Sequence, residues 1–253
     1  FDQYWHDGDF EPYDPARDGG RLEQALSRER RGPSDLPLEI SPLEVRPWSY
    51  QAEILDELDA ERTIHGRWHN LVVMATGTGK TVVAALDYRR LRQREQVDSL
   101  LFVAHREEIL RQSLATFRQV RRDGTFGELM VGGQAPTEWR HVFASIQSLA
   151  NVQLDPSRFD MVIVDEFHHA AAATYTRLLN SLRPKVLLGL TATPERADGQ
   201  DVTRWFGGRI AAQLRLWEAL ERRILVPFHY FGIHDDVSLE HVRFRRGQGY
   251  DVD

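Results

Sequence analysis

A glycine-rich loop set between two apolar stretches is the chemically most distinctive segment of the sequence. Residues 71–74 have the pattern of a buried strand, and apolar residues recur at helical spacing from 82 to 91. In a strand–loop–helix arrangement, glycines let backbone N–H groups close on phosphate oxygens at the helix N-terminus. The pattern therefore predicts a phosphate-binding site formed by Thr76, Gly77, Thr78, Gly79, Lys80 and Thr81.

Two residues of this loop have side chains suited to a nucleoside triphosphate. Lys80 would reach the β and γ phosphates, and Thr81 would ligate Mg²⁺. The chain has 30 arginines and only two lysines, so a lysine at this position indicates a requirement for a compact ammonium group. The strict pattern has glycine where Met74 stands, which leaves an ordinary glycine turn as the alternative. The flanking strand and helix favour the phosphate site.

An acidic pair, Asp165 and Glu166, follows a second apolar run at 161–164. Carboxylates at the end of a buried strand are unfavourable unless a cation or hydrogen bonds compensate them, and Mg²⁺ prefers such oxygen ligands. We therefore assign Asp165 to the metal and Glu166 to the orientation and deprotonation of an attacking water. The alternative is an N-cap aspartate that opens a helix.

A third polar cluster, Thr191 and Thr193, follows the apolar run at 186–190. In open parallel sheets, ligands bind at the carboxyl ends of the strands. The three polar clusters should therefore meet in one crevice.

The arrangement of apolar runs predicts the fold class. Runs near 71–74, 99–104, 141–144, 161–164 and 186–190 alternate with helical patterns, including one that starts near a plausible N-cap at Ser49. This alternation predicts an α/β fold with a parallel sheet and helices on both faces. Residues 1–42 contain an acidic, aromatic stretch, a short arginine-rich helix near 21–31 and several prolines, so we expect an irregular N-terminal extension and linker.

Composition narrows the setting of the protein. The 253 residues carry a formal charge of −6, so any nucleic-acid contact must come from local loops or from another domain. The absence of cysteine excludes disulfides, thiolate zinc sites and a cysteine nucleophile. No apolar run has membrane-spanning length and no signal-peptide pattern opens the chain, so we expect no membrane partner and a cytoplasmic location.

The three clusters resemble the motifs of a known family of motors. Residues 74–81 resemble helicase motif I, residues 165–168 (Asp-Glu-Phe-His) resemble the DExH form of motif II, and residues 191–193 (Thr-Ala-Thr) resemble motif III of superfamily 2. Methionine at the first position of motif I is familiar in the branch that contains the motors of type I and type III restriction enzymes. Further matches are residues 46–51 to the segment whose glutamine reads adenine, 103–108 to motif Ia, and 143–149 to the next motif that contacts a nucleic-acid strand.

The resemblance implies roles for individual residues. Gln51 would contact adenine, and His168, Thr191 and Thr193 would couple hydrolysis to movement. Three residues would touch the sugar-phosphate backbone of a nucleic acid without reading its sequence: His105, Arg106 and Gln147. Because one histidine and one arginine are weak signals, a solvated helix start is the alternative for 105–106. We reject a zinc site at His168 and His169, since adjacent histidines should point apart and no third ligand is suitably spaced.

The resemblance also implies a larger protein. It predicts a RecA-like ATP-binding domain at 43–233 and, at 234–253, the start of a connection to a second RecA-like domain, which would supply an arginine finger. The segment 4–13 resembles the stretch that joins phospholipase D-like nucleases to helicases in bacterial fusion proteins, so a nuclease domain would precede this chain. DNA is the expected nucleic acid because of the restriction-motor resemblance.

The leading hypothesis is thus the ATP-binding, Mg²⁺-dependent domain of a DNA helicase or translocase that acts in DNA processing, restriction or defence. A nucleotide-gated clamp that holds nucleic acid or a partner without translocating uses the same residues and remains open. A phosphotransferase is disfavoured because the sequence shows no acceptor site beside the DExH and Thr-Ala-Thr elements.

Overall fold

The computed structural model describes residues 44–150, 152–194, 201–227, 244–245 and 249–250. The expected N-terminal extension, its helix near 21–31 and most of the expected connection at 234–253 lie outside these residues, so their assignments stay predictions. Within the described part, no helix combines the length and apolar character needed to cross a membrane.

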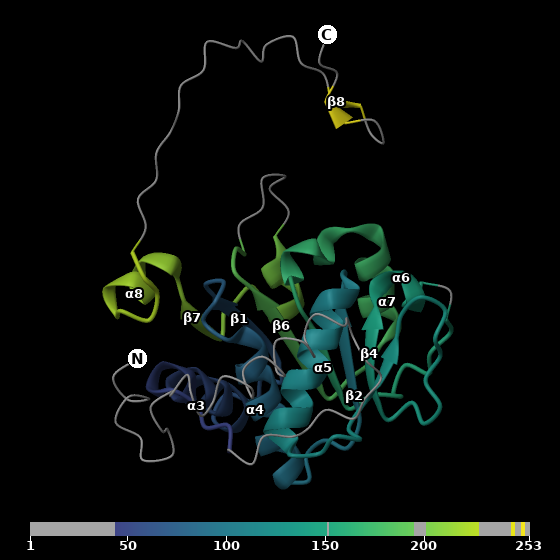
Figure 1. Ribbon diagram of the computed structural model, residues 1–253, viewed down its shortest axis with the longest axis horizontal. Helices are drawn as coiled ribbons and strands as arrows, with labels where there is room; N and C mark the ends of the chain where they lie inside the picture. The colour runs from purple at the N-terminus through teal and green to yellow at the C-terminus, as the bar shows by residue number, and fades with distance from the viewer. Residues whose placement is uncertain (1–43, 151, 195–200, 228–243, 246–248, 251–253) are drawn as a thin grey trace, which may run out of the picture.

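A seven-stranded parallel sheet forms the centre of the protein (Figure 1). The strand order is β3-β4-β2-β5-β6-β1-β7, and every pairing is parallel. The strands are β1 (His69–Met74), β2 (Leu100–Ala104), β3 (Glu128–Met130), β4 (His141–Ser145), β5 (Met161–Val164), β6 (Val186–Thr191) and β7 (Ala212–Leu214). A separate antiparallel pair joins β8 (Phe244–Arg245) to β9 (Gly249–Tyr250).

The apolar runs predicted five of the seven strands. The central strands β2, β5 and β6 are buried along their whole length, which explains their continuous hydrophobic sequences. Two strands were not predicted from the sequence, β3 and β7, which have three residues each and lie at the two edges of the sheet. Such short edge strands carry too few residues for a recognisable period.

Helices cover both faces of the sheet, as predicted. One core cluster includes side chains of α3 (Ser49–Thr63), α4 (Lys80–Gln93), α5 (Glu107–Arg121) and α8 (Leu216–Glu221). The other includes α6 (Ile146–Leu149), α7 (Ala173–Ser181) and the 3-10 helices η1 (Phe167–Ala171) and η2 (Val202–Phe206). Successive strand residues alternate between the clusters: Leu71 and Val73 face the second, and Val72 and Met74 face the first.

A buried ion pair fixes α3 against the helix that follows the glycine loop. The guanidinium of Arg62 donates two hydrogen bonds to the carboxylate of Asp87 on α4, at 2.6 and 2.8 Å, and a third to Asn70 Oδ1 on β1 at 3.2 Å. Both charged side chains are almost fully enclosed. Moving α3 away from α4 would separate Arg62 from Asp87 and leave unpaired charges in the interior. The ion pair therefore holds α3 in one position relative to the loop.

Candidate functional site

The glycine loop joins β1 to α4, as the sequence predicted, and two of its glycines have backbone conformations that other residues rarely adopt. Gly77 has φ = +87° and Gly79, the N-cap of α4, has φ = +81°. The side chain of Met74 is fully buried in the core, so only its backbone faces the loop. Its carbonyl accepts a hydrogen bond from Lys80 Nζ at 3.3 Å. Methionine is therefore compatible with the phosphate-loop geometry at a position where the strict pattern has glycine.

Thr78 anchors the loop from within. Its side chain is buried, and its hydroxyl donates to the carbonyl of Ala75 at 2.7 Å. Thr76 and Gly77 are exposed, and Lys80 and Thr81 are half-buried at the start of α4. Thr76 and Gly77 are thus open to solvent and Lys80 and Thr81 are partly accessible, while the Thr78 hydroxyl is already bonded within the loop; phosphate binding by this loop stays a prediction.

The N-terminus of α3 is hydrogen-bonded to the same loop. Gln51 Nε2 donates to the Thr78 carbonyl at 3.3 Å, and Tyr50 Oη donates to the same oxygen at 3.1 Å. Gln51 Oε1 accepts from the backbone N–H of Trp48 at 3.0 Å, and Trp48 rather than Ser49 is the N-cap. The side-chain amide of Gln51, which is buried, keeps one N–H of Nε2 and one acceptor position of Oε1 beyond these two bonds. The contribution of Tyr50 escaped sequence analysis, although its place next to the predicted glutamine was a usable signal.

The acidic pair follows β5 directly. Asp165 is buried, and desolvation raises the pKa of its carboxyl group, while the nearby positive charge of Lys80 opposes that rise. Its Oδ1 accepts the backbone N–H of Glu166 at 2.9 Å. Glu166 has φ = +51°, a left-handed conformation that is strained for a residue with a Cβ. The N-cap alternative is therefore wrong for Asp165, because the 3-10 helix η1 that follows is preceded by Glu166 instead.

Motif II and motif III side chains are in contact. His168 Nδ1 lies 3.2 Å from Glu166 Oε2 and 3.3 Å from Thr191 Oγ1. Thr191 Oγ1 donates to the carbonyl of Thr193 at 3.1 Å and accepts its backbone N–H at 3.2 Å. The three clusters lie at the carboxyl ends of β5, β6 and β1, which are adjacent strands, as expected.

The chemistry of these groups fits a magnesium–triphosphate substrate. Lys80 supplies a cation, the helix α4 presents its N-terminus, and Thr81 and Asp165 supply the hard oxygen ligands that Mg²⁺ prefers. A site with one carboxylate and one hydroxyl leaves further positions for phosphate oxygens and water, which is the usual way that Mg²⁺ is held. No group of three or more potential metal-ligating His, Asp or Glu side chains occurs in the described part of the chain.

The two adjacent histidines, His168 and His169, do not point apart as expected from their adjacency in sequence. The ring centroids of His168 and His169 are 4.2 Å apart, because the residues lie on the tight 3-10 helix η1. The ring of His105 lies 5.7 Å from that of His169. The argument that adjacent histidines point apart is therefore wrong for residues on this 3-10 helix.

The residues that the resemblance places near a nucleic acid are all exposed. His105 and Arg106 connect β2 to α5, with Arg106 as the helix N-cap, and Gln147 lies on α6 directly after β4. Because β2 and β4 are neighbouring parallel strands, these residues lie at the carboxyl ends of the strands, as the glycine loop does. The helix-start description of 105–106 is also correct, so position alone does not distinguish the two interpretations.

Comparison with known proteins gives a consistent result. The family described as "Type III restriction enzyme, res subunit" matches residues 44–196. The chain is 27% identical over 213 residues to the type I restriction enzyme EcoAI endonuclease subunit of Escherichia coli, covering 80% of this chain and 26% of that protein. It is 28% identical over 197 residues to the ATP-dependent DNA helicase mph1 of Neosartorya fischeri, covering 69% of this chain and 18% of that protein.

Among solved structures, the UvsW helicase of bacteriophage T4 superposes with a TM-score of 0.57 at 16% identity, covering 85% of this chain and 76% of that one. This similarity supports the RecA-like fold expected from the sequence. The chain spans about a quarter of the length of the E. coli relative.

Proposed function

The chain belongs to the type III restriction enzyme, res subunit, family, and from this premise we propose that it is the ATP-binding and ATP-hydrolysing domain of an ATP-dependent DNA helicase or translocase. The observation that carries the proposal is the meeting of three polar clusters at the ends of three adjacent strands, with Lys80 close enough to influence the carboxyl group of Asp165. A structural glycine turn accounts for none of these contacts.

The residues of the loop bind the triphosphate. Backbone N–H groups at the start of α4 hold phosphate oxygens, and Lys80 exchanges its contact with the Met74 carbonyl for one with phosphate. Gln51, already fixed to the loop through Thr78, offers its remaining amide positions to the adenine base. Because one carbonyl anchors both Tyr50 and Gln51, the base and phosphate subsites are held at a fixed separation.

Hydrolysis requires a base and a correctly placed water. Glu166 has its carboxylate held by contact with His168, and it is the residue that would orient the water and accept its proton. Thr81 and Asp165 would hold Mg²⁺, which would neutralise charge that develops on the phosphate oxygens. His168, Thr191 and Thr193 would then transmit the state of the Glu166 carboxylate to β6.

DNA is the proposed track, with contacts at His105, Arg106 and Gln147 along the same sheet edge. The names of the restriction and DNA-helicase relatives support DNA over RNA. We further propose that the complete protein contains a second RecA-like domain in cis and a nuclease domain before this chain. The domain boundaries at 43 and 233 belong to the same proposal.

Two variants test the nucleotide assignment. Lys80→Ala should weaken binding of ATP with Mg²⁺ by at least about tenfold in calorimetry, because a charge-assisted phosphate contact is removed from an accessible loop. Glu166→Gln should keep that affinity and abolish turnover in the full-length protein, because an amide keeps the shape and cannot accept a proton. Unchanged affinity in Lys80→Ala would refute the phosphate site. Turnover at the parental rate in Glu166→Gln would place the catalytic base elsewhere. If the full-length parent protein shows neither DNA-stimulated turnover nor translocation, the clamp hypothesis is favoured.

A further inference from the structure

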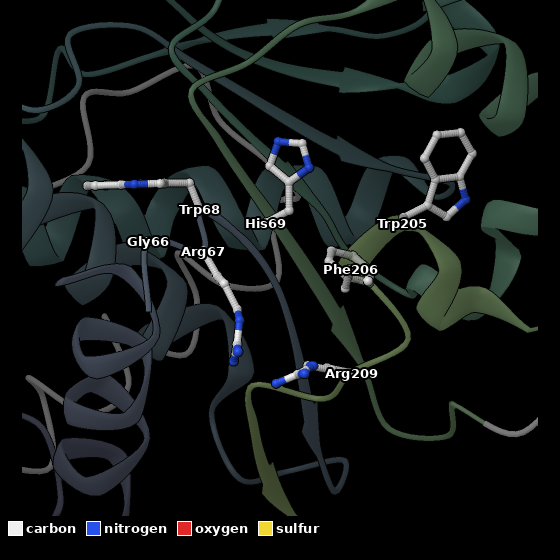
Figure 2. Close-up of a pocket in the computed structure, with 8 residues that line it drawn as sticks. Gly66, Arg67, Trp68, His69, Trp205, Phe206 and Arg209 are labelled. Carbon is white, nitrogen blue, oxygen red and sulfur yellow. The ribbon is translucent and has the colours of Figure 1, made fainter. Parts of the chain in front are cut away.

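A groove lies at the amino ends of the strands, whereas the glycine loop lies at their carboxyl ends. Its main cavity, of about 450 Å³, is bordered by Arg67, Trp68, His69, Trp205, Phe206 and Arg209. Figure 2 shows Arg67 and Arg209 reaching in from different segments, with Trp68 and Trp205 on opposite sides. Two adjoining hollows, of about 240 and 380 Å³, share Trp205 and bring in Arg183 and Arg204. We refer to these residues together as the Trp205 groove.

The groove is far from the nucleotide chemistry. His69 is the first residue of β1 and Met74, which precedes the glycine loop, is the last. A strand of this length separates its ends by roughly 17 Å. None of the residues assigned to ATP, Mg²⁺, coupling or DNA lines the groove. Its composition therefore calls for a separate explanation.

The groove combines positive charge with aromatic surface. Arg204 and Arg209 are exposed, and within the described part of the chain neither forms an ion pair, whereas Arg67 is paired with Glu61 at 3.1 Å. The Arg204 guanidinium lies 5.4 Å from the centre of the Trp205 ring. Trp205 is only half-buried. In a chain with a net charge of −6, such a cluster favours a partner that is both acidic and aromatic.

The N-terminal segment of this chain has that composition. Residues 1–18 contain six acidic residues against one arginine, together with five aromatic residues. We propose that this segment binds in the Trp205 groove, with its carboxylates on the arginines and its aromatic side chains against Trp68 and Trp205. The contact would hold the N-terminal segment at the amino ends of the strands, opposite the proposed ATP site.

The chain is long enough for this contact. Residues 19–43 separate the segment from the first described residue, Glu44, and a chain of that length spans roughly 80 Å if fully extended and roughly 60 Å with the expected short helix near 21–31. A domain of this size has a radius of gyration of roughly 16 Å, so every part of its surface is within reach. Tethering through a linker of about this length can give a local concentration of about 1 mM. Modest affinity therefore suffices for occupancy.

A single nucleic-acid strand would also match arginines and aromatic rings. The N-terminal segment is favoured because it is tethered and because the proposed DNA contacts lie at the carboxyl ends of the strands, away from the groove. The two occupants differ in an experiment on the whole chain, since the natural sequence contains no cysteine and any introduced pair is the only pair of thiols.

The test is disulfide formation between Gly8→Cys, which keeps every acidic and aromatic residue of the segment, and a second cysteine on the domain. Asn180→Cys is an exposed position on the groove, and Gln112→Cys is an exposed position on α5. We expect the intramolecular disulfide with position 180 to form about tenfold faster than that with position 112, because docking concentrates the segment at the groove.

Charge reversal supplies the matched control. In the 8/180 pair, Arg204→Glu with Arg209→Glu should reduce the rate to that of the 8/112 pair, whereas Arg111→Glu on α5 should leave it unchanged. Thermal unfolding midpoints close to the parent's would confirm that the variants are folded. Equal rates at positions 180 and 112 would overturn the proposal. A predominance of disulfide-linked dimers would also overturn it, because the segment would then bind a second copy of the chain. Photo-cross-linking of single-stranded DNA to the groove, together with equal rates, would identify nucleic acid as the occupant. None of these readouts depends on nucleotide binding.

Discussion

The imidazole Nδ1 of His168 lies 3.3 Å from the hydroxyl oxygen of Thr191, and this contact joins the end of β5 to the end of β6. The same nitrogen is 3.2 Å from Glu166 Oε2. Thr191 Oγ1 donates its own proton to the Thr193 carbonyl, and the carboxylate can only accept. Nδ1 of His168 must therefore carry a hydrogen in this arrangement.

This proton assignment gives the coupling hypothesis a physical form. A change in the charge of Glu166 alters how strongly it competes with Thr191 for the His168 N–H. Thr191 is fully buried at the end of β6, and its hydroxyl is hydrogen-bonded to the backbone carbonyl and N–H of Thr193. The charge of the Glu166 carboxylate can thus affect the segment that follows β6.

Thr191→Val removes the hydroxyl and keeps the shape of the side chain. In the full-length protein we expect ATP affinity to change by less than about twofold and DNA-stimulated turnover to fall by about tenfold or more, because one strong hydrogen bond is worth roughly 1.5 kcal/mol. Steady-state ATPase assays with and without DNA measure this. Thr193→Val is the matched control, since Thr191 contacts only the backbone of Thr193. An equal loss in Thr193→Val would transfer the role to the Thr193 hydroxyl.

Sequence patterns predicted the fold because its strands are buried on both faces. Continuous apolar runs marked β1, β2, β4, β5 and β6, and the polar residues that end three of these strands define the candidate site. The edge strands β3 and β7 have three residues each, too few for a period.

Contacts between distant residues were harder to predict. The hydrogen bonds from Tyr50 and Gln51 to the Thr78 carbonyl cross 28 and 27 residues of sequence, respectively, and they depend on how α3 packs beside the loop. The Trp205 groove likewise combines the start of β1 with η2, and no linear pattern joins those segments. The 3-10 geometry of η1, which brings the rings of His168 and His169 to a centroid distance of 4.2 Å, also lacks a sequence signal.

Asp165→Asn should stabilise the domain in the absence of nucleotide and Mg²⁺ while it impairs metal binding. Burial raises the pKa of Asp165 in the folded state, so the folded protein holds this proton more tightly than the unfolded chain. Stability is then lost as pH rises from the unfolded pKa through the raised folded pKa, and the penalty is complete above both. The thermal midpoint of Asp165→Asn should therefore exceed that of the parent at pH 7, and the difference should shrink towards pH 4.

Asp98→Asn is the control with the opposite sign. The hydrogen bond from Arg140 lowers the pKa of Asp98, so its ionised form favours the folded state. This variant should have a midpoint equal to or below that of the parent at pH 7. A lower midpoint for Asp165→Asn at pH 7 would show that the carboxylate is compensated in the free protein.

Gly79→Ala should disturb the loop for two separable reasons. The residue has φ = +81°, and an added Cβ would lie 2.6 Å from Gln51 Nε2. Gly208→Ala is a matched control, because Gly208 has φ = +74° with nothing within 4 Å. Each variant should lose about 1 kcal/mol from backbone strain, and Gly79→Ala should lose more and bind ATP more weakly. In chemical denaturation, adding Gln51→Ala to Gly79→Ala should recover part of the extra loss. Equal losses at positions 79 and 208 would mean that Gln51 moves aside freely.

Residues 1–253 alone should show little DNA-stimulated ATPase, whereas a protein that continues through a second RecA-like domain should show strong stimulation. The proposed DNA contacts here are one histidine, one arginine and one glutamine on a chain of net charge −6, which supply only a small part of the phosphate neutralisation that tight binding requires. An arginine finger from a second domain contributes roughly a thousandfold or more in turnover.

Stimulation also requires DNA to close a cleft between two domains, and a single domain has no such closure. Assays of both proteins at low and moderate salt, with and without single-stranded DNA, measure the difference. Strong stimulation of residues 1–253 would mean that a partner chain or another residue of this chain completes the site. Without stimulation of the longer protein, the clamp becomes the better account, because the contact between His168 and Thr191 would then gate binding and not movement.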